Sequence, residues 1–91
     1  MANVRAHVRI DGYVQGVFFR STARTVASAH GVKGWIHNRP DGSVEAVLEG
    51  DEADIASMID WCRQGPAGAL VESVEVDWEP PTGEFATFAV R

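Results

Sequence analysis

The sequence has little cysteine, little lysine and no long apolar run. Its single cysteine, Cys62, excludes an intramolecular disulfide and a cysteine-rich zinc site, and it fits a reducing compartment, so we expect a cytoplasmic protein. No stretch is apolar for long enough to form a transmembrane helix or a signal peptide. We therefore expect no contact with a membrane.

Positive charge is also scarce. Eight Lys plus Arg stand against 13 Asp plus Glu, which gives a formal net charge of -5. That sign is wrong for a protein that binds nucleic acid or an anionic membrane through its overall field. Lys33 is the only lysine, and the arginines that make up the other cations suit bidentate recognition of an oxyanion. Any anionic ligand must therefore be held by a local site.

Hydrophobic periodicity predicts two strand, helix, strand halves within one domain over residues 1–91, a length typical of a single small domain. In the first half we expect a strand over 4–11, a glycine-containing loop over 12–20, a helix from Ser21 ended by Gly31, and a hairpin with strands over 32–38 and 43–49. The apolar stripe of that helix would be Ala23, Val26, Ala27 and His30.

The second half is predicted in the same way. A helix capped by Asp51 should bury Ile55, Met58, Ile59 and Cys62 and end at Gly65-Pro66. A strand follows with Leu70, Val74, Val76 and Trp78 on one side, and a short last strand covers 85–90. Two such halves favour an α+β fold: a ferredoxin-like βαββαβ sandwich, an antiparallel sheet with two helices on one face and a short terminal strand.

This topology places two polar residues close together. The first two strands run in the same direction, so the loop before Arg20 and the end of the second strand at Asn38 share one edge of the sheet. Asn38 also has the parity of Ile36, which directs its side chain toward the helices. We therefore expect Arg20 and Asn38 to be neighbours.

The loop that leads into the first helix has the chemistry of an anion site. Free backbone N–H groups and the positive end of the helix dipole attract an anion, and the Arg20 guanidinium could grip two of its oxygens. Asn38 could orient a water without acting as a base. Taken alone, these residues also fit a loop that only turns a corner and an asparagine that only serves the following turn, and only the pairing of Asn38 with Arg20 favours a functional role.

The segments Gly12–Arg20 and Gly34–Glu45 resemble the two signature segments of the acylphosphatase family, and the similarity extends over essentially the whole chain. The resemblance implies the βαββαβ fold and hydrolysis of acyl phosphates to carboxylate and orthophosphate. It assigns phosphate binding to Arg20 and positioning of the attacking water to Asn38. Substrate-binding residues would be Val14, Gln15, Gly16, Val17, Phe18, Phe19 and Arg20. The chain departs from some members of the family at Arg39, where they have Thr. Any hydrogen bond from that hydroxyl is therefore absent here, but we do not expect this to abolish activity.

Phosphoryl transfer to water needs mainly positioning and charge stabilisation, and a carboxylate leaves without a strong acid. We expect no metal and no cofactor, because the acidic residues are spread over strands and a turn, namely Asp11, Asp41, Glu45 and Glu49. We also expect a broad, flat pH profile, because neither arginine nor asparagine changes charge near neutrality.

The remaining tempting residues favour structural interpretations. We expect solvent-facing or structural roles for His7, His30 and His37, and an inert buried thiol at Cys62. The aromatic side chains of Phe18, Phe19 and Trp35 should pack in the protein. The acidic cluster of Asp51, Glu52 and Asp54 should cap the second helix.

Three alternatives stay open at this stage. The first is a ligand-binding or regulatory module without activity, and the second is a partner-binding domain like those in larger carbamoyl-transfer maturation enzymes. The third is an RNA binder using Arg5 and Arg9, which the acidic residues of the same sheet face would oppose, namely Glu45, Glu49, Glu75 and Asp77. We expect a monomer whose partner is a small acyl phosphate and not nucleic acid. The residues do not indicate which acyl group that substrate carries, because the expected contacts are all to its phosphate.

Overall fold

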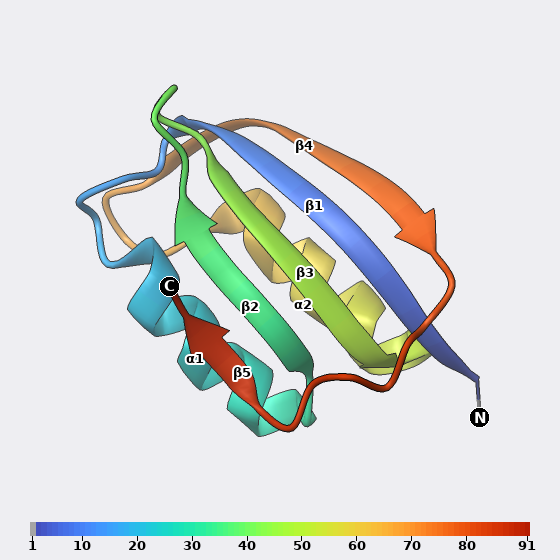
Figure 1. The fold of residues 1–91 in the computed structure, drawn as a ribbon. Coiled ribbons are helices and arrows are strands. Elements are labelled where there is room, and N and C mark those ends of the chain that lie inside the picture. Colours follow the sequence, from blue (N-terminus) through green and yellow to red (C-terminus); the bar gives the residue numbers. More distant parts are fainter. Residues whose placement is uncertain (1) are drawn as a thin grey trace.

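The computed structural model describes residues 2–91 as a five-stranded sheet with two helices (Figure 1). The elements are β1 (Asn3–Tyr13), α1 (Phe19–His30), β2 (Lys33–Asn38), β3 (Val44–Asp51), α2 (Glu52–Gln64), β4 (Leu70–Glu79) and β5 (Phe88–Val90). The strands lie in the order β4-β1-β3-β2-β5. The predicted element order and the ferredoxin-like α+β class are confirmed.

The sheet is mixed, which refines the predicted antiparallel arrangement. β1 pairs antiparallel with β3 and β4, and β2 pairs antiparallel with β3. The terminal strand β5 pairs parallel with β2, with Phe88 opposite Gly34 and Val90 opposite Ile36. The strand is shorter than the expected 85–90. Its pairing brings the end of the described chain beside the end of β2.

Both helices cover the same face of the sheet, and the core lies between them and the strands (Figure 1). From β1 this core takes the alternating residues Ala6, Val8 and Ile10, all fully buried. From α2 it takes the predicted stripe, Ile55, Met58, Ile59 and Cys62. The opposite face of the sheet, which no helix of residues 2–91 covers, is called the open face below.

Helix α1 begins at Phe19, two residues before the expected Ser21. The reason is packing: the Phe19 side chain is only 2% exposed and its ring centroid lies 5.0 Å from that of Trp61. Phe19, Ala23 and Ala27 form the buried stripe, and His30 is exposed, so the predicted stripe was wrong at that end. Arg20 therefore lies in the first helical turn and not in the loop. The predicted stop at Gly31 is confirmed by its left-handed φ of 67°.

Strand β4 departs from its predicted alternation. Leu70 is 70% exposed and Trp78 58% exposed, although both were expected on the apolar side. The register slips where Gly12 pairs with Val71, so Val71 replaces Leu70 in packing against the core. Gly12 permits this close approach, because a Cβ there would lie 2.1 Å from the Leu70 carbonyl oxygen. Trp78 lies near the end of β4, which is an edge strand of the sheet.

Helix α2 begins after Asp51, as predicted, but the Asp51 side chain makes no capping hydrogen bond. A backbone bond ties this helix start instead, from Glu52 N to Ala2 O (3.1 Å). Glu52 and Asp54 remain in the first turn, where they complement the helix dipole. Within residues 2–91, neither helix is both long and apolar enough to cross a membrane.

Candidate active site

The loop between β1 and α1 has an unusual backbone. Gly16 has φ 74° and Phe18 has φ 63°, so two left-handed residues are separated by one. Left-handed and right-handed residues in succession turn backbone N–H groups toward one side and form a concave anion nest. The Phe18 conformation also begins the helix, because Phe18 is the residue that precedes its first turn.

The start of α1 leaves further N–H groups free of helical partners. The first bond back to the loop is donated by Thr22 N to Phe18 O, at 3.1 Å. The amides of residues 19–21 precede it and have no acceptor within the helix. The first turn also carries no acidic side chain that would neutralise the positive end of the dipole. The loop and the helix start thus offer donors and positive potential at one place.

Arg20 supplies the cation, and its side chain is held from one side. Its Nη1 donates to the carbonyl oxygen of Arg91 at 2.8 Å. Arg91 is itself fixed, because its N–H donates to Ile36 O at 2.8 Å and its guanidinium lies 4.9 Å above the ring of Trp35. One Arg20 nitrogen is therefore used for orientation, and the other N–H donors of the guanidinium remain for an anion.

Asn38 ends β2 on the side that faces the helices, with the parity of the fully buried Ile36. Its Oδ1 is buried and has no hydrogen-bond partner among the residues that the structure describes. A buried polar atom of this kind needs a donor, and a bound ligand or water could supply it. The asparagine therefore presents an acceptor to whatever enters the site.

Arg20 and Asn38 line the same pocket, as the topology predicted. The pocket has a volume of about 340 Å³ and is lined by Val14, Gly16, Phe18, Phe19, Arg20, Ser21, Asn38 and Val90. Sequence reasoning missed Ser21 and Val90. Both were missed for the same reason, because the early start of α1 and the parallel pairing that brings Val90 here depend on contacts between distant segments.

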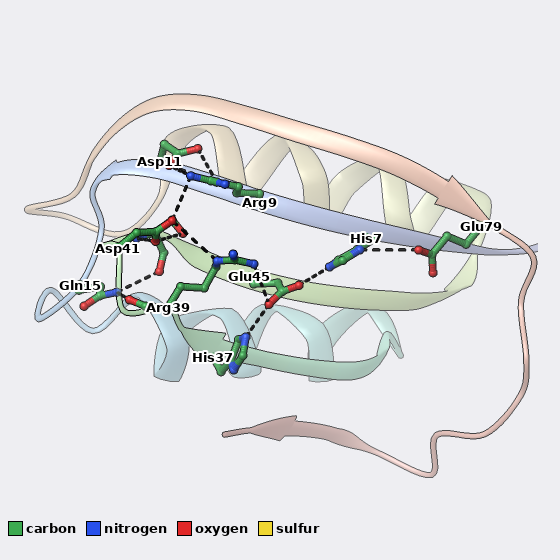
Figure 2. Close-up of polar contacts among 10 residues, drawn as sticks. His7, Arg9, Asp11, Gln15, His37, Arg39, Asp41, Glu45 and Glu79 are labelled. Carbon is green, nitrogen blue, oxygen red and sulfur yellow. Dashed lines mark hydrogen bonds and ion pairs between the residues drawn. The ribbon is translucent and has the colours of Figure 1, made fainter.

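The side chains of two residues in the expected substrate-binding loop, Val17 and Gln15, are engaged outside the pocket. Val17 packs against the core. The Gln15 amide nitrogen donates to the carbonyl oxygens of Arg39 (2.7 Å) and Ser43 (2.9 Å), in the turn between β2 and β3 (Figure 2). The Gln15 side chain thus fastens the loop to the residue that follows Asn38. Only the backbone amides of these two residues remain available to an anion.

The residues on both sides of Asn38 turn to the open face. There His37 Nε2 lies 2.6 Å from Glu45 Oε1, Arg39 Nη1 lies 3.3 Å from the same oxygen, and His7 contacts Glu45 Oε2 (Figure 2). These contacts, led by the hydrogen bond with His37, hold the pKa of Glu45 below its usual value. Arg39 does not line the pocket, so its side chain serves the open face.

The other tempting residues have structural surroundings. Burial raises the pKa of the Cys62 thiol to about 12, which makes it inert as predicted. His30 pairs with Asp54 at 3.4 Å at the far end of α1, and Trp35 lies on the open face between His7 and His37. Phe18 is the exception to the expected aromatic packing, because it is 79% exposed and lines the pocket. Among residues 2–91 no group of three or more His, Cys, Asp or Glu is arranged to hold a metal ion.

Comparison with known proteins identifies similar proteins by sequence and by structure. The acylphosphatase family model matches residues 6–90. An acylphosphatase from Pyrobaculum islandicum is 55% identical over 91 residues, which are 99% of this chain and 96% of that protein. The structure of an acylphosphatase from Coxiella burnetii matches with a TM-score of 0.93 and 34% identity over 98% of this chain and 93% of that one. T. kodakarensis HypF matches with a TM-score of 0.83 and 30% identity, but this chain covers only 12% of it.

Proposed function

Because the chain belongs to the acylphosphatase family, it is a hydrolase of acyl phosphates, and we propose that Arg20, the loop amides and Asn38 perform the reaction without a metal ion. The single observation that carries this proposal is the pairing of two complementary groups in one pocket. The Arg20 guanidinium, oriented by its hydrogen bond to Arg91 O, and the buried Asn38 oxygen, which has no partner within residues 2–91, line the same pocket.

The phosphoryl group binds to the donors. Its oxygens accept hydrogen bonds from the loop amides and the amides at the start of α1, and Arg20 balances their charge. These donors are fixed by the backbone and by the bond from Arg20 to Arg91 O, so they need no rearrangement as charge shifts between oxygens during the reaction.

Asn38 Oδ1 accepts a hydrogen from a water and aims its oxygen at phosphorus. The new bond joins the water oxygen to phosphorus, and the bond from phosphorus to the acyl oxygen breaks. The electron pair of that bond leaves with the carboxylate, and both hydrogens of the water end on orthophosphate. No protein group has to change its protonation state, because a carboxylate is a good leaving group and the asparagine only orients the water.

The test is orthophosphate release from an aromatic acyl phosphate in excess EDTA, with wild type, Arg20→Ala and Asn38→Ala side by side. Arg9→Ala is the matched control, because Arg9 is an arginine of the open face paired with Asp11 and Asp41. We expect turnover in wild type and the control and its loss in both site variants. Asn38→Ala should still bind orthophosphate, whereas Arg20→Ala should not.

Two outcomes would contradict the proposal. Turnover that disappears in EDTA and returns with a divalent ion would show that a metal takes part. Orthophosphate binding through Arg20 without any turnover in wild type would show that the pocket serves recognition, as in a ligand-binding module.

We also propose that residues 1–91 act as one domain, as a cytoplasmic monomer that does not bind nucleic acid. The described elements share one core, which supports a single domain. The edge strand β4 carries Glu72, Glu75, Asp77 and Glu79, and charges of one sign on an edge discourage pairing with another chain. Light scattering at several protein concentrations tests the monomer, and a constant mass is the expected result.

A further inference from the structure

The side chain of Phe18 stands out on the pocket wall. It is the most exposed of the large apolar side chains in residues 2–91, at 79%, and it lines the same pocket as Arg20 and Asn38. It is absent from the buried core and from the residues packed against it. The ring therefore contributes nothing evident to the folding of the described chain.

The backbone at this position adds a second observation. Phe18 is the only residue other than glycine with a positive φ among those described, and a bulky side chain is strained there. The nest needs the left-handed conformation, but glycine or asparagine would adopt it with less strain. The chain thus keeps an aromatic ring where neither the core nor the backbone favours one.

The pocket offers two kinds of surface to the two ends of an acyl phosphate. Its donors and the Asn38 oxygen serve the phosphoryl end and the water. The carbon end then meets the apolar part of the pocket lining, to which Val90 and the exposed ring of Phe18 contribute surface. An apolar group that covers this ring removes apolar surface of both partners from water.

We propose that Phe18 is a specificity-determining residue that binds the acyl group, and that the enzyme favours aromatic or extended apolar acyl phosphates over acetyl phosphate. This inference rests on the proposed function, because it places the phosphoryl group on Arg20 and the loop amides. The phosphate contacts do not involve the acyl group, whereas a contact with Phe18 would let the enzyme distinguish one acyl group from another.

The experiment compares kcat/KM for benzoyl phosphate and acetyl phosphate in wild type, Phe18→Asn and Phe18→Tyr. Asparagine tolerates the left-handed backbone and removes the ring, whereas tyrosine keeps the ring. Tyr13→Asn is the control, because Tyr13 is an exposed aromatic residue, at 63%, that does not line the pocket. Dividing the benzoyl to acetyl ratio of each variant by that of wild type cancels the difference in chemical reactivity between the two substrates.

We expect the ratio to fall by about tenfold in Phe18→Asn, the upper range for loss of an aromatic contact, and to stay near that of wild type in the other two variants. The inhibition constant of orthophosphate should not change in Phe18→Asn. That result would show that the loop amides keep their geometry in the variant. An equal loss of activity on both substrates, or an unchanged ratio, would overturn the inference.

A binding measurement separates this inference from the proposed function. Benzoylphosphonate and acetylphosphonate are mimics in which a P–C bond replaces the bond that is hydrolysed. If wild type proved inactive, the proposed catalysis would fail. Preferential binding of benzoylphosphonate that is lost in Phe18→Asn would still support the inference, and equal binding of both mimics would overturn it.

Discussion

The two sides of β2 use polar residues in opposite ways. On the open face, His37 and Arg39 contact Glu45, and His7 closes the group from β1 (Figure 2). On the helix side, Asn38 leaves its Oδ1 without a partner among the described residues, and Arg20 bonds only to a backbone oxygen. The three consecutive residues 37–39 thus divide between a network of side chains that contact one another and a pocket whose polar groups stay available.

The difference shows where to look for activity. The open face holds more titratable side chains, yet their donors and acceptors are largely used on each other, for instance Arg9 on Asp11 and Asp41. The pocket holds one charged side chain and one amide. Binding of an anion and a water needs free donors and acceptors, so the pocket is the better candidate although it is poorer in ionisable groups.

The largest expected effect comes from replacing the arginine of the pocket by lysine, with the same replacement on the open face as the control. Arg20→Lys should lower kcat/KM by roughly 100-fold or more, because an ammonium cannot bond Arg91 O and grip two phosphoryl oxygens in the same geometry. Arg9→Lys keeps its charge beside Asp11 and Asp41 and should retain activity. Steady-state kinetics on an aromatic acyl phosphate measures both, and near wild-type turnover in Arg20→Lys would break the comparison.

A smaller effect is expected where the two sides meet. Gln15 fastens the loop to the turn after Asn38, so its loss should let the phosphate donors and the asparagine drift apart. Gln15→Glu has the same shape but sets a carboxylate against two carbonyl oxygens, and we expect kcat to fall by roughly tenfold. Gln15→Met removes the donor without introducing repulsion, so kcat should fall less than in Gln15→Glu. Equal kcat values for wild type and Gln15→Glu would show that the loop is held by its backbone alone.

Much of the fold followed from the sequence because its signals are local. The alternation in β1, the stripe of α2 and the glycine stop at Gly31 each depend on neighbouring residues, and all three are confirmed. The proximity of Arg20 and Asn38 also followed, because a crossover through the first helix gives β1 and β2 the same direction, so that their carboxyl ends share an edge of the sheet.

The failures share a physical cause, which is contact between distant segments. The early start of α1 depends on Phe19 packing against Trp61, and the slip in β4 depends on Gly12 approaching Leu70. The position of Val90 in the pocket depends on the pairing of β5 with β2. Within the candidate site, the Gln15 contacts reach a turn 24 and 28 residues away, and no local pattern could have predicted them.

The open face should affect stability more than catalysis. The pKa of Glu45 is lowered in the folded protein, so its carboxylate stabilises the fold fully above its unfolded value, about 4.3. That contribution is lost as pH falls through the lower folded value. Glu45→Gln should therefore lower the free energy of unfolding by on the order of 1 kcal/mol at pH 7, and by less in acid. Urea unfolding at both pH values measures this, and a large loss of kcat at pH 7 would show that the two sides are coupled.

The smallest expected effect is the dependence of activity on pH. Arginine and asparagine side chains as a class do not change charge between mildly acidic and mildly alkaline solution, so kcat/KM should stay nearly constant there. Histidine is the side chain that commonly does change charge in this range, and His7 and His37 lie on the open face, away from the pocket. A bell-shaped profile that becomes flat in His37→Gln would show that this network reaches Asn38 through β2. A profile that is flat in wild type would mean that the titratable face and the reacting groups work independently.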